Sequence, residues 1–187
     1  FLSLGLLVGM AGALSAQTPT TDTIESPVVD ADGNTVGMLY AGQSNSGVTL
    51  TVLLDAGALA PGEHGVHIHE TGSCDPSGET TFSLAGAHFN PTDTHHGAPG
   101  SDMSHAGDLG NLTVAEDGSA QFSITTDSVT LVSGETNSLT DVDGAALVIH
   151  AGVDDLTTDP SGESGGRLLC SVISPATAEI TAATPAA

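Results

Sequence analysis

The sequence predicts an all-β domain, on three observations. Gly, Thr, Val, Ser and Asp are abundant, whereas Lys, Arg and aromatic residues are scarce. Short apolar runs alternate with turns that contain Gly and Asp, which is typical of strands joined by tight connections. The Glu-, Lys- and Leu-rich stretches that form long helices are missing. The 187 residues are enough for one domain with a substantial core, and no internal repeat is visible.

Strand signals recur along the chain, and turn residues separate them. Asp32-Gly33-Asn34 is a hairpin turn, and Glu116-Asp117-Gly118 joins two later strands. Two connections, residues 70–108 and 151–166, are long and have little strand character, so each needs a structural or functional reason. The predicted strands are 24–30, 35–40, 48–54, the segment with His67 and His69, 109–115, 120–126, 145–150 and 167–173.

Both ends of the chain differ in composition from the domain. Residues 1–16 are apolar, small and uncharged. They are too few to span a membrane and match the apolar part of a secretory signal peptide. We therefore expect residues 1–16 to be a signal-peptide remnant and the protein to be exported, to the periplasm or outside the cell, with no membrane attachment after cleavage. We expect residues 17–23 to be a linker, 24–174 the folded domain and 175–187 a disordered tail.

The charge balance is strongly acidic. The 23 acidic residues face a single basic residue, which gives a formal net charge of −22. Nucleic acid and anionic membrane surfaces are excluded as partners, because binding phosphate requires Lys and Arg. One interpretation is a well-solvated surface that keeps the protein soluble. The other is adaptation to high salt, where a screening length of about 3 Å at 1 M removes self-repulsion.

The only cation and the two cysteines each have two interpretations. Arg167 either forms an ion pair with an acidic neighbour such as Glu163 or binds an anion in a functional site. Cys74 and Cys170 form either one disulfide or two buried thiols. An even cysteine count in an exported chain favours the disulfide.

Histidines carry the main functional signal. His67 and His69 are two residues apart on a predicted strand, so their side chains share one face while Val66 and Ile68 face the core. Two neighbouring imidazoles on a strand make half of a metal site, and imidazole suits copper and zinc. A single carboxylate in a mostly histidine set suits zinc. Two sets could each hold an ion: His67, His69, His88 and His150, and His88, His96, His105 and Asp108.

Six motifs follow one another along the chain. They are His64-Gly65-Val66-His67-Ile68-His69-Glu70, Gly86-Ala87-His88-Phe89-Asn90-Pro91, His96-Gly97-Ala98-Pro99, His105-Ala106-Gly107-Asp108-Leu109-Gly110-Asn111, His150-Ala151-Gly152-Val153-Asp154-Asp155 and Gly165-Gly166-Arg167-Leu168-Leu169-Cys170. Together they resemble the signatures of the copper/zinc superoxide dismutase family. The resemblance runs from about residue 24 to 174, and Gly72-Ser73-Cys74 is similar to its exported bacterial branch.

This resemblance implies an eight-stranded Greek-key β-barrel, an immunoglobulin-like sandwich with two long functional loops. It implies an enzyme that converts superoxide to dioxygen and hydrogen peroxide, with one copper and one zinc per subunit. Copper would lie on the first histidine set and zinc on the second, and His88 would bridge both ions and carry a proton. Arg167 would orient superoxide, and Cys74 and Cys170 would form the family's disulfide.

The resemblance also implies roles for residues around the metals. Asp154 would join the copper ligand His67 to the zinc ligand His96. His64 would be a packed structural histidine beneath the copper site, and His95 an exposed neighbour of His96.

One departure from the family is the lack of lysines around the substrate channel. The loop 151–166 carries only acidic charge, from Asp154, Asp155, Asp159 and Glu163. Two further hypotheses stay open: a copper- and zinc-binding module that buffers metal without turnover, and a copper-only relative, against which His96, His105 and Asp108 argue. The sequence does not decide between a monomer and a homodimer.

Overall fold

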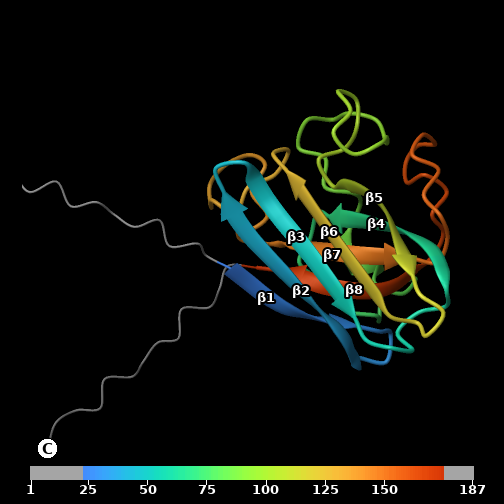
Figure 1. Ribbon diagram of the computed structural model, residues 1–187. Coiled ribbons are helices and arrows are strands. Elements are labelled where there is room, and N and C mark those ends of the chain that lie inside the picture. The colour runs from blue at the N-terminus through green and yellow to red at the C-terminus, as the bar shows by residue number, and fades with distance from the viewer. Residues whose placement is uncertain (1–22, 175–187) are drawn as a thin grey trace, which may run out of the picture.

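The computed structural model of the chain describes residues 23–174, and eight antiparallel strands form one nearly closed sheet (Figure 1). The predicted signal remnant and tail lie outside the described residues, as does the predicted linker except for Thr23, which begins the first strand. The strands are β1 (Thr23–Val29), β2 (Thr35–Ser44), β3 (Gly47–Leu54), β4 (Gly62–His69), β5 (Asp108–Val114), β6 (Ala120–Thr126), β7 (Ala145–His150) and β8 (Arg167–Ile173).

The order of the strands in the sheet is β5-β4-β7-β8-β1-β2-β3-β6. The chain therefore crosses over between β3 and β4 and again between β6 and β7, which makes a Greek-key connectivity. One wall holds β1, β2, β3 and β6 and the other β4, β5, β7 and β8 (Figure 1). The outermost strands β5 and β6 contact each other and nearly close the barrel. The predicted all-β, eight-stranded barrel is confirmed.

Alternation of apolar and polar residues forms the core between the walls. In β3, Val48, Leu50, Val52 and Leu54 are buried, and the residues between them face outward. The predicted end of the second strand at residue 40 was wrong, because β2 continues to Ser44. Pairing with β1 on one side and β3 on the other extends the strand beyond the reach of its own sequence pattern.

Strands β4 and β7 are buried on both faces. Val66 and Ile68 face the core, so His67 and His69 project from the opposite face of the barrel wall. The register pairs His67 with Val148 and His69 with Ala146. Since His150 is in phase with Ala146 and Val148, the end of β7 presents its imidazole on that same face.

The long segment between β4 and β5 covers this face. It contains one short helix, η1 (Ser83–Ala85), which the sequence did not predict. No helix among residues 23–174 is long and apolar enough to cross a membrane. A disulfide joins Cys74 in this segment to Cys170 on β8. Around it lies a second apolar cluster, formed by Phe82, Ala85, Ala146, Val148 and Cys170 with Cys74 packed against it.

Replacing both cysteines with alanine is expected to lower the free energy of unfolding of the metal-free protein by up to about 4.7 kcal/mol. The two cysteines are 96 positions apart, so the disulfide removes much of the conformational freedom of the unfolded chain. Alanine leaves no unpaired hydroxyl in the buried Cys170 position. Denaturant unfolding measures the difference, with reduced wild-type protein as the control. A change below about 1 kcal/mol would contradict this entropic account.

Candidate metal centre

Four buried histidines converge outside the barrel wall. His67 and His69 stand on β4 and His150 ends β7. His88, in the middle of the long segment between β4 and β5, forms an isolated β-bridge with His69, which brings its ring beside the other three. One ligand nitrogen from each of these four residues lies within 4.8 Å of the others. All four residues are at most 7% exposed.

One nitrogen of each of these rings has a protein partner. The contacts join His67 Nε2 to Asp154 Oδ2 at 2.8 Å, His69 Nδ1 to the Gly86 carbonyl at 2.9 Å, His88 Nδ1 to Asp108 Oδ1 at 2.9 Å and His150 Nδ1 to the Gly165 carbonyl at 3.1 Å. Among the remaining nitrogens, those of His69 and His150 lie 3.4 Å apart, and His67 Nδ1 and His88 Nε2 are buried without any hydrogen-bond partner. Buried polar atoms are rarely left unpaired. Four converging imidazole nitrogens are a donor set that fits copper.

Burial also keeps the imidazoles of His69, His88 and His150 neutral, which is the form that binds metal. It lowers the pKa of His150 to about 3 and the pKa of His88 to about 4. It lowers the pKa of His69 well below its ordinary value as well, and the Arg167 charge adds to that shift. At neutral pH the Nε2 atoms of His69, His88 and His150 therefore carry lone pairs rather than extra protons.

A second set of donors surrounds the buried carboxylate of Asp108, at the start of β5. Its Oδ1 lies 2.9 Å from His88 Nδ1, 3.0 Å from His96 Nδ1 and 3.2 Å from His105 Nδ1. Its Oδ2 accepts the backbone N–H groups of Gly97 and His105, each at 3.0 Å. Burial acts to raise the pKa of Asp108, but the hydrogen bond from His88 and the Gly97 amide outweigh it, and the pKa falls to about 2. The group is thus an anion at neutral pH.

Ligand atoms of His67, His88, His96 and Asp108 also lie within 4.8 Å of one another, in a group that does not include His105. His67 is occupied elsewhere, because its Nε2 lies on Asp154 and its Nδ1 belongs to the first set, whereas His88, His96 and His105 share the Asp108 oxygen. Tetrahedral zinc with bonds of about 2.0–2.1 Å separates its ligand atoms by roughly 3.3 Å, which is close to the distances around Asp108. Three Nδ1 atoms and one carboxylate therefore fit zinc.

Asp154 lies between the two sets. Its Oδ2 contacts His67 Nε2 and its Oδ1 contacts His96 Nε2, both at 2.8 Å. Asn111 on β5 holds its backbone, donating to the Asp154 carbonyl at 2.9 Å and accepting the Asp154 N–H at 2.8 Å. Burial acts to raise the pKa of Asp154, but hydrogen bonds, the one from His67 foremost, lower it overall.

The half-buried guanidinium of Arg167 sits at the edge of the first set. Its Nη1 donates to the Phe82 carbonyl at 2.7 Å and its Nη2 to the Gly86 carbonyl at 2.6 Å. Within residues 23–174 there is no ion pair between Arg167 and Glu163, so that interpretation is not supported. A cavity of about 600 Å³ is lined by Arg167, His69, His88 and His150, with Glu70 also on its wall.

Phe82 has a part in this arrangement that the sequence did not indicate. Its side chain is fully buried in the apolar cluster beside the disulfide. Its backbone is left-handed, with φ of 56°, an unusual conformation for a bulky residue. This conformation aims its carbonyl at Arg167. No sequence signal, other than an aromatic residue in a polar loop, could have revealed it.

The other two histidines lie outside both sets. His64 is 5% exposed, with Nδ1 2.7 Å from the His150 carbonyl and Nε2 3.0 Å from the Ala60 carbonyl. It therefore packs against the backbone of β7 below the first set. His95 is exposed and its Nδ1 lies 2.8 Å from Asp159 Oδ2.

Comparisons with known proteins agree with this geometry. The sequence profile of the family described as "Copper/zinc superoxide dismutase (SODC)" matches residues 35–173. The Cu-Zn superoxide dismutase 2 of Aquifex aeolicus is 37% identical over 170 residues, which span 90% of this chain and 96% of that protein. The Cu-Zn superoxide dismutase of Deinococcus radiodurans is 36% identical over 179 residues, spanning 91% and 92% of the two chains.

A solved structure is also similar to this chain in fold and in sequence. A double mutant of a SOD-like protein from Bacillus subtilis superposes with a TM-score of 0.72 at 37% identity, covering 80% of this chain and 95% of that one. The profile match covers most of the chain, and the relatives exceed one third identity over nearly their whole length. The chain therefore belongs to the copper/zinc superoxide dismutase family and is an enzyme of that family, with copper and zinc as its cofactors.

Proposed function

We propose that this chain dismutes superoxide with copper held by one histidine set and zinc held by the other. His67 Nδ1, His69 Nε2, His88 Nε2 and His150 Nε2 would hold copper, and His88, His96, His105 and Asp108 would hold zinc. The observation that carries this proposal is that His88 has one nitrogen in each set, Nδ1 on Asp108 and Nε2 buried without a partner in the first set. His88 would therefore bridge the two ions.

The reaction consumes two superoxide anions and two protons. One anion is oxidised to dioxygen, and the other is reduced and protonated to hydrogen peroxide. When bound, copper supplies the one-electron redox chemistry, and zinc, which does not change oxidation state, holds His88. The protein must bind the anion, orient it and deliver protons.

Arg167 would bind and orient superoxide at the mouth of the site. A guanidinium has five N–H donors in a planar fork. Two of its nitrogens are anchored on the carbonyls of Phe82 and Gly86, which fixes the plane of the fork on the wall of the cavity. The donors left over can hold a small anion beside His69, His88 and His150. Charge-assisted hydrogen bonds of this kind are shorter and stronger than neutral ones.

His88 would carry a proton on Nε2 whenever that nitrogen is not bound to copper. Its other nitrogen stays on Asp108, so the ring keeps its orientation while Nε2 gains or loses the proton. His88 also lines the cavity, which places that proton next to the bound anion. A positioned group of this kind is a general acid.

The bounds of the functional domain and the compartment in which it works are also part of this proposal. We propose that residues 24–174 are the functional domain and that the chain works after export, in the periplasm or outside the cell. The disulfide between Cys74 and Cys170 supports an oxidising compartment. Export would place the enzyme where superoxide from outside the cytoplasm is met first.

Elemental analysis of the purified protein together with a dismutation assay tests the proposed function. We expect one copper and one zinc per chain, and turnover that disappears when copper is removed and returns when it is restored. A protein that binds both metals at this ratio without turnover would instead be a metal-buffering module. Copper without zinc would identify a copper-only relative.

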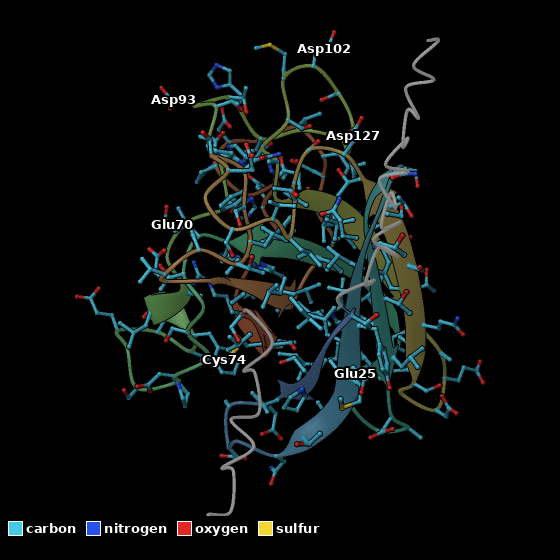
Figure 2. The ribbon with its side chains drawn as sticks, turned by 90° about the vertical axis from the view of Figure 1, so that its left-hand side faces the viewer. Glu25, Glu70, Cys74, Asp93, Asp102 and Asp127 are labelled. Carbon is cyan, nitrogen blue, oxygen red and sulfur yellow. A yellow bond between two sulfur atoms is a disulfide. The ribbon has the colours of Figure 1, made fainter. Side chains whose placement is uncertain are left out.

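Added salt is expected to leave the rate constant for superoxide unchanged or to raise it. Exposed acidic residues are spread around the surface, among them Glu25, Asp93, Asp102 and Asp127 (Figure 2). Glu70, also exposed, lines the cavity. With a net charge of −22, the overall field repels an anion, and salt screens that repulsion. Pulse radiolysis at increasing concentrations of an inert sodium salt measures the effect.

Glu70→Gln is the matched variant for this experiment. The amide keeps an oxygen for the Ala87 N–H, which Glu70 Oε1 now accepts at 3.1 Å, and removes only the charge. Its rate constant should rise at low salt and depend less on salt. A steep decrease in the wild-type rate with salt would show instead that the site attracts superoxide over long range.

A further inference from the structure

The second long loop holds His96 at two points. Asp154 Oδ1 contacts its ring at Nε2, at 2.8 Å. Asp159, five residues further along the same loop, accepts the backbone N–H of His96 on Oδ1 at 2.6 Å. Asp154 belongs to the centre described above, whereas Asp159 is in neither donor set and its side chain is 49% exposed. The contact between Asp159 and the His96 N–H therefore comes from a residue outside the metal centre.

The other carboxylate oxygen of Asp159 lies 2.8 Å from Nδ1 of His95, whose side chain is 71% exposed. Exposed ion pairs contribute little, because solvent screens them and two side chains must be ordered. The N–H of the buried His96 is different, since a short hydrogen bond from a buried group to a carboxylate is among the stronger kinds. Of the two contacts of Asp159, the one with the His96 N–H is therefore expected to contribute more to stability than the one with His95.

The turn that carries Asp159 is fixed by its own hydrogen bonds. The carboxylate of Asp155 accepts the N–H groups of Thr157 at 2.9 Å and Thr158 at 2.8 Å. The Thr158 carbonyl accepts the Gly162 N–H at 2.7 Å. Gly162 has φ of 62°, and a Cβ there would overlap Asp154 Oδ1, so this turn packs directly against the Asp154–His96 contact. Asp159 thus has little freedom to move relative to His96.

The two residues after Asp159 connect this turn to the substrate cavity. Pro160 and Ser161 line the cavity together with His88, His105 and Arg167. The contact between Asp159 and His96 therefore joins one wall of the cavity to a residue of the second donor set.

We propose that Asp159 is a positioning residue for His96. Through the backbone N–H of His96, its carboxylate holds that histidine against Asp108 and slows the release of zinc. The inference rests on the proposed function, in which His96 is a zinc ligand. It adds a second, outer contact to the one that Asp154 makes with the ring.

The test compares the rate of zinc transfer to a chromogenic chelator from protein loaded with copper and zinc. Asp159→Ala removes the acceptor, and we expect release about tenfold faster, at the lower end of the effect of residues that support metal ligands. Asp159→Asn keeps Oδ1 as an acceptor and should restore a rate within roughly twofold of wild type. His95→Ala removes only the exposed pair and should release zinc at the wild-type rate.

The visible spectrum of cobalt bound in the zinc position reports the geometry of the ligands, which a general loss of stability would not change. This spectrum should change in Asp159→Ala and return to the wild-type form in Asp159→Asn. An unchanged rate of zinc release in Asp159→Ala, a rate in His95→Ala as fast as that in Asp159→Ala, or an unchanged cobalt spectrum in Asp159→Ala would each overturn the inference. A wild-type protein that holds zinc without dismuting superoxide would contradict the proposed function instead.

Discussion

Replacing Arg167 with alanine is expected to lower kcat/KM for superoxide about a hundredfold while copper and zinc stay bound. Removing one donor to a developing or bound anion from a preorganised site typically costs about 10²–10³ in rate. Arg167 is the only arginine or lysine in the chain, so no neighbouring cation can replace it. Its own partners are backbone carbonyls, which stay in place when the side chain is shortened. Pulse radiolysis and elemental analysis of the same sample measure both quantities.

Arg167→Lys is the matched control, because it keeps the charge and loses the planar fork. We expect its rate constant to lie between those of wild type and Arg167→Ala. If metal content and rate fell together in Arg167→Ala, the arginine would act by supporting the loop rather than by binding the anion. A rate unchanged in Arg167→Ala would remove the arginine from the mechanism altogether.

Replacing Asp154 with alanine is expected to weaken zinc binding by about 10- to 100-fold, which is the usual effect of losing an outer carboxylate. Asp154 is 2% exposed and holds one ring nitrogen of His67 and one of His96. Without it, both rings lose the contact that fixes their orientation, and buried imidazole N–H groups are left unpaired. Competition with a zinc chelator measures the affinity, and the Cu(II) spectrum should change as well because His67 is in the first set.

Glu163→Gln is the control from the same loop. Glu163 is exposed and makes no side-chain hydrogen bond or ion pair within residues 23–174, so removing its charge should leave zinc affinity unchanged. Equal weakening by the two substitutions would show that the charge of the loop, rather than the contacts of Asp154, determines zinc affinity. If zinc affinity were unchanged in Asp154→Ala, the contact of Asp154 with His96 would not contribute to zinc binding.

The predictions that came from local patterns were accurate. The spacing of His67 and His69 placed both side chains on one face, and the alternation in residues 48–54 predicted a strand that the structure extends by one residue, to Gly47–Leu54. Both depend on the two-residue period of a strand, which the sequence displays directly. The end of β2 was missed because Gly42 and Gln43 carry no strand signal. Their conformation is decided by pairing with β3 and, for Gly42, also with β1.

The features that could not be predicted depend on contacts between distant residues. The orientation of the His67 ring follows from Asp154, 87 positions away, and the plane of the Arg167 guanidinium from the Phe82 carbonyl, 85 positions away. The sequence left an ion pair with Glu163 open for Arg167, because a nearby carboxylate is visible in a sequence and a backbone carbonyl is not. The left-handed backbone of Phe82 is likewise set by the surrounding apolar cluster and the disulfide.

The central claim is that one imidazole is shared by two adjoining metal sites. Crystals of the loaded protein, measured at the absorption edges of copper and of zinc, test it most directly. The account predicts copper against Nε2 of His88 with His67, His69 and His150, and zinc against Nδ1 of His88 with His96, His105 and Asp108. Finding His88 bound to one ion alone, or either ion on a different set of side chains, would contradict it.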